Sequence, residues 1–169
     1  PDIAEGRDSR CAVSGLGGDI YVWKNICSIK VFDTTTLQWK ANLDLPDIPE
    51  PRYFAAAVLL KERYLVVIGG NNERDTATAS SLIYDISSNL WSSTPTSMNM
   101  IEARYCHTAE VLDGKIVVAG GDGQNSAVAS VECIDADALL EYAPLHYPLP
   151  TLLFNRILEI GKFELERVD

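Results

Sequence analysis

A glycine-rich stretch at residues 117–127, VVAGGDGQNSA, is the first candidate for chemistry. An apolar strand that runs into closely spaced glycines can bring backbone N–H groups close to a nucleotide phosphate. The same pattern also ends a buried strand at a tight turn with no ligand. A dinucleotide fingerprint needs a strand, a glycine turn and then a helix. Here another predicted strand follows, so the second interpretation is favoured, and the loop after the glycines is the part expected to be functional.

Cysteine and histidine were searched for metal-ligand spacing and for nucleophilic catalysis. None of the four cysteines forms a Cys-x-x-Cys pair or has a histidine at metal spacing, and no Ser, His and Asp triad follows from spacing. We expect no metal centre, no cofactor and no enzymatic activity. The cysteines are interpreted as small apolar residues and His107 as a structural hydrogen-bonding residue. The four cysteines are Cys11, Cys27, Cys106 and Cys133.

Composition bounds the class of protein. The chain has 169 residues, of which 47% are hydrophobic, so one domain with a sizeable core is expected. A net charge of −10 argues against nucleic acid as the partner, and the lack of a long apolar run predicts no membrane span. The start, PDIAEGRDSR, has no signal pattern and no initiator Met, so an excised or processed piece is expected. The cysteine usage predicts a cytoplasmic or nuclear location.

Internal repeats organise the chain, because unlike landmarks recur at one spacing of about 51 residues. RYLVVIGG at 63–70 returns as GKIVVAGG at 114–121, and VFDTTTLQW at 31–39 returns as IYDISSNLW at 83–91. Single residues recur in the same way. They are Arg52 and Arg104, Trp39 and Trp91, and Asp33, Asp85 and Asp135.

Each repeat is interpreted as four short strands. In the second, a small-residue strand at 54–60 precedes YLVVIGG, whose apolar run is typical of a strand buried on both faces. A polar loop, an alternating strand and a fourth strand of mixed polarity complete the unit. In the third, Asp113 and Gly114 are a tight-hairpin signal. Residues 10–148 contain no convincing helical period, so the predicted class is all-β with four-stranded antiparallel units.

These residues resemble the kelch repeat, whose units are the blades of a β-propeller. The resemblance is carried by an arginine, a small apolar strand, a strand ending in Gly-Gly, a loop, and a Tyr-Asp or Phe-Asp pair with tryptophan six residues after the aspartate. It implies a partial propeller of about three blades. The approximate repeats are 10–44, 52–98 and 104–148, and residues 149–169 are a tail or the start of a fourth blade.

Two repeats depart from the pattern. In the first, Gly17 and Gly18 align with the hairpin turn, while Trp23 and Lys24 occupy the place of the glycine pair. The third has Glu141 where tryptophan is expected. Because propellers have four to eight blades, we expect the remaining blades to come from missing sequence, another copy or another chain.

The other recurring residues have structural interpretations. The aspartates are expected to cap the turn after the third strand through side-chain to backbone hydrogen bonds. The tryptophans are expected to pack between blades.

The recurring arginines are the strongest candidates for binding. Strand parity places the connector before each blade and the loop after each glycine pair at the same end. Arginines there suit carboxylate or phosphoryl groups, and the resemblance implies an acidic peptide, because kelch substrate adaptors of cullin ubiquitin ligases bind such peptides with arginines at this place. The alternative is that each arginine pairs with a neighbouring carboxylate and only supports the face. The candidate partner-binding residues are Arg52, Tyr53, Arg104, Tyr105, Asn71, Asn72, Asp122, Gln124 and Asn125.

The predicted function is a non-catalytic platform that binds a protein or peptide on the loop face around the propeller channel. It would serve as a substrate receptor of a ubiquitin ligase or as a cytoskeletal scaffold. One alternative is a fragment of a kelch enzyme similar to copper radical oxidases, which the two histidines of this chain disfavour. The other is a structural subunit whose open edge is filled by a partner.

Overall fold

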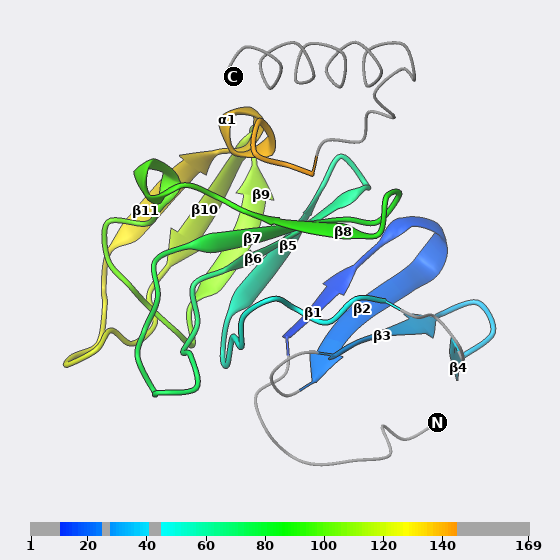
Figure 1. Cartoon of the computed structure of the whole chain (residues 1–169), viewed down its shortest axis with the longest axis horizontal. Coiled ribbons are helices and arrows are strands. Elements are labelled where there is room, and N and C mark those ends of the chain that lie inside the picture. Colours follow the sequence, from blue (N-terminus) through cyan, green and yellow to red (C-terminus); the bar gives the residue numbers. More distant parts are fainter. Residues whose placement is uncertain (1–10, 25–27, 41–44, 145–169) are drawn as a thin grey trace, which may run out of the picture.

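The architecture is three antiparallel sheets that lie side by side (Figure 1). The structure is a computed structural model that describes residues 11–24, 28–40 and 45–144. Each sheet is one sequence repeat, and the three are called blades one, two and three in chain order. The predicted all-β class and the partial-propeller architecture are confirmed. The expected tail or fourth blade at 149–169 lies outside the described residues.

The strands of each blade are hydrogen-bonded in chain order. Blade one contains β1 (Cys11–Ser14), β2 (Asp19–Lys24), β3 (Ser28–Asp33) and β4 (Gln38–Trp39). Blade two contains β5 (Ala56–Leu60), β6 (Tyr64–Ile68), β7 (Ser81–Asp85) and β8 (Leu90–Ser93). Blade three contains β9 (Thr108–Leu112), β10 (Lys115–Ala119) and β11 (Val131–Asp135), followed by the helix α1 (Ala136–Leu140). The first strands of the blades are neighbours, with β5 between β1 and β9.

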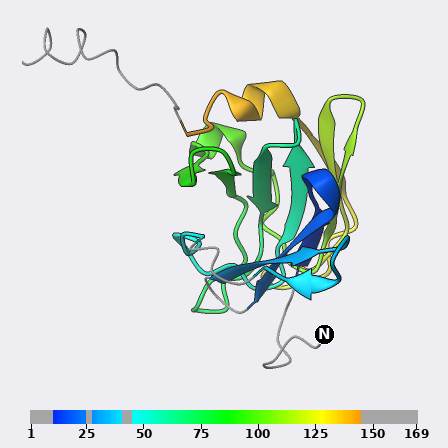
Figure 2. The ribbon, with the colours of Figure 1, turned by 90° about the vertical axis from the view of Figure 1, so that its right-hand side faces the viewer.

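Blade three ends in a helix of five residues, which corrects the prediction that every unit has four strands. The helix is too short to give a helical period in the sequence. Asp135 is the N-cap of α1, and its carboxylate accepts a hydrogen bond of 2.8 Å from the backbone N–H of Ala138. The segment after this cap is Ala-Asp-Ala-Leu-Leu, rich in good helix formers. Figure 2 shows α1, in orange, at one end of the blades. Its Leu139 is fully buried, so the helix also contributes to the core.

Blade two is the centre of the core because it is covered on both faces. Val66 and Ile68 of β6 belong to a cluster shared with blade three, whereas Leu65 and Val67 belong to a cluster shared with blade one. All four are fully buried or nearly so. Successive side chains of a strand point to opposite faces, so a strand between two blades must be apolar at every position. This explains the continuous apolar run at YLVVI.

Blade three is covered on one face only. Ile116 and Val118 of β10 are fully buried against blade two, while the alternate positions of the strand remain exposed or half-exposed. On the uncovered face, Leu112 is 60% exposed and Val131 is 63% exposed. In blade two, the corresponding face is packed against a neighbour. Within the described residues, blade three therefore has the sheet face of a propeller blade without the blade that would cover it.

The glycine pair after β6 is a point of close backbone approach between two blades. The backbone N–H of Gly70 donates a hydrogen bond of 2.8 Å to the carbonyl of Arg104 in the next connector. A Cβ atom on Gly69 would lie only 2.6 Å from that same carbonyl oxygen. A side chain therefore does not fit at the end of this strand.

The recurring aspartates cap turns, as predicted. Asp33 accepts hydrogen bonds from the backbone N–H groups of Thr35 and Thr36, and Asp85 accepts one from Ser87. Asp85 is fully buried and also forms a bidentate pair with Arg63, at 2.8 and 2.6 Å. The Arg63 guanidinium, with smaller contributions from hydrogen bonds of Ser87, holds the pKa of Asp85 well below its usual value. This carboxylate therefore stabilises the β7–β8 turn as an anion.

The prediction that the tryptophans pack between blades is right for Trp91 and wrong for Trp39, whereas the predicted hairpin turn at Gly17 and Gly18 is present. Trp91 packs against the cluster between blades one and two, and its indole N–H donates to the carbonyl of Pro46 at 3.2 Å. Trp39 packs edge-on against Phe32 of its own blade. In blade one, Gly17 and Gly18 form the β1–β2 turn with positive φ, and β2 continues through the place of the glycine pair.

The glycine pairs offer a matched test of the contact between blades. Gly69 and Gly120 occupy the same place in their repeats and have similar φ angles of 61° and 66°, so alanine strains the backbone equally at both. At Gly120, however, the nearest atom to an added Cβ is 3.9 Å away. We expect Gly69→Ala to lower the free energy of unfolding by about 1–3 kcal/mol more than Gly120→Ala, because only the former forces two blades apart. Urea denaturation measures both, and equal losses would contradict the contact.

Asp85 gives a second test, at acid pH. A folded-state pKa below the unfolded one means that the ionised carboxylate stabilises the fold above about pH 4, and that this contribution is lost as the pH falls further. Asp85→Asn should lower the free energy of unfolding by about 2 kcal/mol at pH 7. The difference from the unsubstituted chain should shrink in acid. Asp33→Asn, at an exposed turn, is the control and should lower the free energy of unfolding by less. A pH-independent difference would argue against this role for the charge.

Candidate functional site

The segments predicted to converge do lie together at one end of the blades. We define the loop face as residues 49–53, 71–79, 101–105 and 122–127. Isolated bridges pair Tyr53 with Asn71 and Tyr105 with Asp122, so each connector lies against the loop of its own blade. The two loops also touch each other, because the amide of Gln124 accepts from Ala77 N–H at 3.0 Å and lies 3.4 Å from the carbonyl of Asp75. The loop face is therefore one connected surface over blades two and three.

Arg52 is buried beneath this surface, at 4% exposure. Its guanidinium lies 3.3 Å from the carbonyls of both Gly69 and Ser80, which stand on either side of the loop at 71–79. It also donates 2.7 Å to the Ser80 hydroxyl and 2.8 Å to the carboxylate of Glu50. One planar side chain thus holds both stems of the loop at 71–79. Thr78, inside the loop, is a further acceptor.

Arg104 repeats the arrangement in blade three and is fully buried. It donates to the carbonyls of Gly120 and Ser130 at 3.2 and 2.9 Å, and to the Ser130 hydroxyl at 2.8 Å. The carboxylate of Glu132 pairs with the same guanidinium. The two arginines therefore act alike: each clamps the base of its own loop. We call these two arrangements the arginine clamps.

The charges of the clamp arginines are balanced by neighbouring groups of the same chain. Burial lowers the pKa of the Arg52 guanidinium, and the adjacent Glu50 carboxylate raises it. A guanidinium remains charged in proteins, so burial requires paired carboxylates and carbonyl acceptors. Of the two open alternatives, the geometry matches the supporting one, in which each arginine pairs with neighbouring groups. In this arrangement, neither guanidinium is presented to a partner.

Some of the other candidate residues hold the loops in shape, and others are exposed at the surface. Asn71 is buried, and its amide donates to Asp75 at 2.8 Å. The side-chain oxygen of Asn72 accepts from the backbone N–H of Arg74 and Thr76, which shapes the loop. In contrast, Asp122 and Asn125 are exposed on the second loop. The exposed part of the loop face is therefore made by loop tips.

The mouth of the channel carries an aromatic pair that the sequence analysis identified only in part. Phe54 is 46% exposed and has a positive φ of 55°, which is unusual for a bulky residue. Its ring lies 6.3 Å from that of Tyr105, centroid to centroid, at an interplanar angle of 48°. Phe54 and His107 both line a cavity of about 340 Å³. Phe54 belongs to the strand segment of the repeat, so its pattern predicted packing and gave no signal of exposure.

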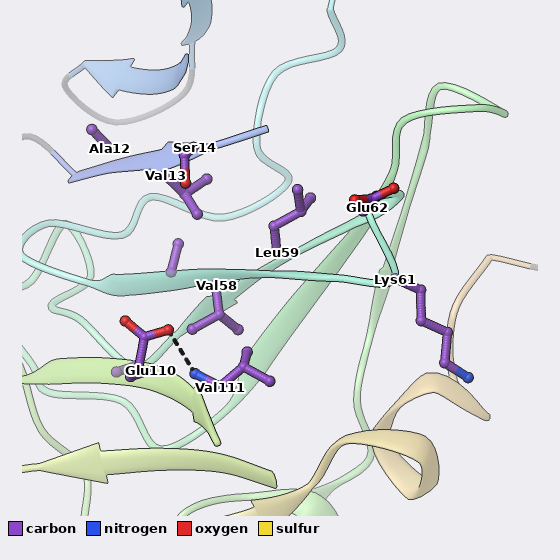
Figure 3. A pocket seen from close by; sticks show the side chains of 11 residues that line it. Ala12, Val13, Ser14, Val58, Leu59, Lys61, Glu62, Glu110 and Val111 are labelled. Carbon is purple, nitrogen blue, oxygen red and sulfur yellow. Dashed lines mark hydrogen bonds between the residues drawn. The ribbon is translucent and has the colours of Figure 1, made fainter. Parts of the chain in front are cut away.

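Further along the inner strands, a second cavity of about 440 Å³ is lined by β1, β5 and β9 and by the turn after β5 (Figure 3). Ala12, Ala57 and Ala109 line both cavities, so the two are continuous along the inner edges of the blades. These alanines pair with Val22, Val67 and Val118, the same place in each blade. In Figure 3, Glu110 accepts a hydrogen bond from the backbone N–H of Val111 at 3.0 Å. Small alanine side chains thus line the channel where the two cavities meet.

The thiols of the channel mouth are poor nucleophiles. Burial raises the pKa of Cys11 to about 11. Burial, with the nearby Asp122 carboxylate, also raises the pKa of Cys106. Thiolate is the reactive form of cysteine, so both side chains are largely unreactive at neutral pH. Across the ranges that the structure describes, no three His, Cys, Asp or Glu residues group closely enough to hold a metal ion.

Sequence comparison agrees with this geometry. A sequence model of the KLHDC2/KLHL20/DRC7 Kelch-repeats domain matches residues 9–144. The chain belongs to the kelch-repeat family. Each described sheet is therefore a kelch blade, with the clamp arginine on the connector that precedes blades two and three.

Two curated relatives illustrate how this kelch domain is used in longer proteins. F-box/kelch-repeat protein At1g15670 of Arabidopsis thaliana is 30% identical over 129 residues, which cover 72% of this chain and 34% of the relative. Kelch-like protein 24 of Homo sapiens is 36% identical over 113 residues, or 66% of this chain and 17% of the relative. The chain thus spans about a third of the first relative and a sixth of the second.

Among the helices of the described residues, none has the length and apolar character needed to cross a bilayer.

Two acceptors of the clamps were missed by sequence reasoning. Ser80 and Ser130 each lie five residues before the capping aspartates Asp85 and Asp135. That constant spacing was present in the repeat pattern, and it could have identified them as partners of the recurring arginines. Glu132 has no such signal, because the corresponding residue of blade two is Leu82.

The clamps can be tested by removing one guanidinium. Arg104→Met leaves the carbonyls of Gly120 and Ser130 and the carboxylate of Glu132 without their donor. We expect a loss of about 3 kcal/mol in the free energy of unfolding. Arg74→Met, at an exposed position of the neighbouring loop, is the matched control and should change stability by less than about 0.5 kcal/mol. Urea denaturation followed by fluorescence measures both. Equal stabilities would contradict the clamp.

Proposed function

We propose that the chain is a non-catalytic interaction platform that binds a segment of a partner protein on its loop face. The observation that carries the proposal is the preorganisation of this surface. Two loops of different sequence are clamped at their stems by Arg52 and Arg104 and are joined to each other through Gln124. Loops held by a rigid scaffold bind with a smaller loss of conformational entropy. Membership of the kelch-repeat family supports the same role.

We further propose that the bound protein is the substrate of a ubiquitin ligase, with this chain as its receptor. Support comes from the name of one relative, an F-box/kelch-repeat protein, in which a kelch domain is combined with another module. A cytoskeletal scaffold would use the same surface. The acidic partner expected from the arginines gains no support from the clamps, because both guanidinium groups are occupied inside the fold.

A second role, as one part of a larger ring, is supported by the uncovered face of blade three. Leu112 and Val131 are exposed there, and the space beside Gly120 is open. We propose that a further blade covers this face in the complete protein. In that protein, the cost of Gly120→Ala should rise to that of Gly69→Ala.

The platform is tested by blocking the loop face without disturbing the clamps. Asn125→Trp places a bulky side chain on an exposed loop tip, and Glu141→Trp places the same side chain beyond α1 at the opposite end. Partners are captured with the unsubstituted chain, identified by mass spectrometry, purified and titrated against all three forms. We expect Asn125→Trp to weaken binding at least about tenfold and Glu141→Trp to leave it unchanged. A partner whose affinity falls only with Glu141→Trp would place binding elsewhere and refute the proposal.

A further inference from the structure

The charge of the loop face is opposite to what its arginines imply. Its exposed ionisable side chains are five carboxylates and one cation, Arg74. Arg52 and Arg104, the remaining cations of this surface, are buried and paired. The carboxylates of Glu50 and Glu102 lie at the clamps but stay 61% and 54% exposed. The five carboxylates are Glu50, Glu73, Asp75, Glu102 and Asp122.

Beside this acidic surface lies the mouth cavity, the cavity of about 340 Å³ between the first strands of the three blades. Phe54 forms part of its wall, and Tyr105 packs against the Phe54 ring. Asp122, bridged to Tyr105, is close enough to raise the pKa of Cys106 in the same wall. The mouth cavity therefore combines aromatic faces with a nearby carboxylate. Aromatic faces attract lysine and arginine cations, and a carboxylate strengthens that attraction.

A buried polar group in the wall is an independent sign of a ligand. His107 lines the mouth cavity and is only 7% exposed, and one of its ring nitrogens faces the backbone carbonyl of Ile68 as a hydrogen-bonding partner. The other ring nitrogen has no partner among the described residues, although buried polar atoms are nearly always paired. Burial, together with the charge of Arg104, lowers the pKa of His107 to about 4. The ring is neutral at pH 7 and offers one nitrogen as an acceptor.

We propose that the mouth cavity binds the side chain of a lysine or arginine from a basic segment of the partner protein. Phe54 and Tyr105 contact the cationic side chain, His107 accepts a hydrogen bond from it, and the five carboxylates attract the flanking basic residues. This inference rests on the proposed function and names the chemistry of its partner. The charge of Arg104 does not oppose it strongly, because Glu132 and Glu102 compensate that charge locally.

The test uses the full chain and two fluorescein-labelled peptides. One alternates lysine with serine, and the other has glutamate in place of each lysine. Fluorescence anisotropy should show binding of the basic peptide only, weakening by about tenfold or more between low and high salt as the acidic surface is screened. Equal or stronger binding of the acidic peptide, or no binding of the basic one, overturns the inference.

Variants locate the bound peptide. The double variant Asp122→Asn with Glu73→Gln removes two exposed carboxylates of the loop face. It should lower the affinity for the basic peptide about three- to tenfold. Asp113→Asn with Glu141→Gln makes the same chemical change at exposed positions of the opposite end and should have no effect. Phe54→Leu, which keeps an apolar side chain but removes the ring, should weaken binding about threefold. Equal effects of the two double variants would show non-specific charge attraction and overturn the inference.

His107 provides a direct readout of the cavity. In the His146→Gln variant, a single histidine remains, so its imidazole resonances are unambiguous. Titration with the lysine peptide should shift these resonances, and the glutamate peptide should leave them unchanged. Binding of the lysine peptide without a shift would place it outside the mouth cavity and contradict the inference. A captured partner that depends on Asn125 but ignores the Asp122 and Glu73 substitutions would overturn the inference while leaving the proposed function intact.

Discussion

The burial of a guanidinium at the start of a blade is the constraint on which the loop face of this protein depends. A charge taken out of water must be surrounded by acceptors with the right geometry, or it destabilises the fold. In blade two these acceptors are the carbonyls of Gly69 and Ser80, and in blade three those of Gly120 and Ser130. Satisfying the cation therefore fixes the distance between the two stems of each loop. The loops can differ in sequence because their bases are held by the same chemistry.

The packing between blades depends on the same connectors that carry the clamp arginines. Because the backbone N–H of Gly70 bonds the carbonyl of Arg104, the residue that clamps one loop also positions its blade against the previous one. The apolar clusters on either side of blade two then account for most of the buried side chains. Blade one lacks the glycine pair, and one face of blade three is uncovered. Among the described blades, blade two alone therefore has both the glycine contact with the next connector and apolar clusters on its two faces.

The repeat made the fold predictable, and its irregular parts were the ones that failed. Gly-Gly, Asp and Trp recur at constant spacing, and each has one dominant structural role, so the blades and their capped turns followed from sequence. α1 did not, because the same aspartate that caps a β-turn in blades one and two caps a helix when Ala-Asp-Ala-Leu-Leu follows it. The loop face was predictable in position but not in charge. Strand parity located Arg52 and Arg104 at the correct end, whereas their burial depends on Ser80, Ser130 and Glu132, which only the folded chain brings into contact.

The separation between clamped stems and exposed tips has a consequence for how such a surface can change. Substitutions at Asp122 or Asn125 change the exposed chemistry of the loop face, while the stems at Gly120 and Ser130 keep their bonds to Arg104. Stability and recognition are thereby assigned to different residues of the same short segment. Such a division marks 73–74 and 125–127 as the segments to randomise when a new binding specificity is selected from a library, because Asn72 and Gln124, which shape and join the loops, then stay in place.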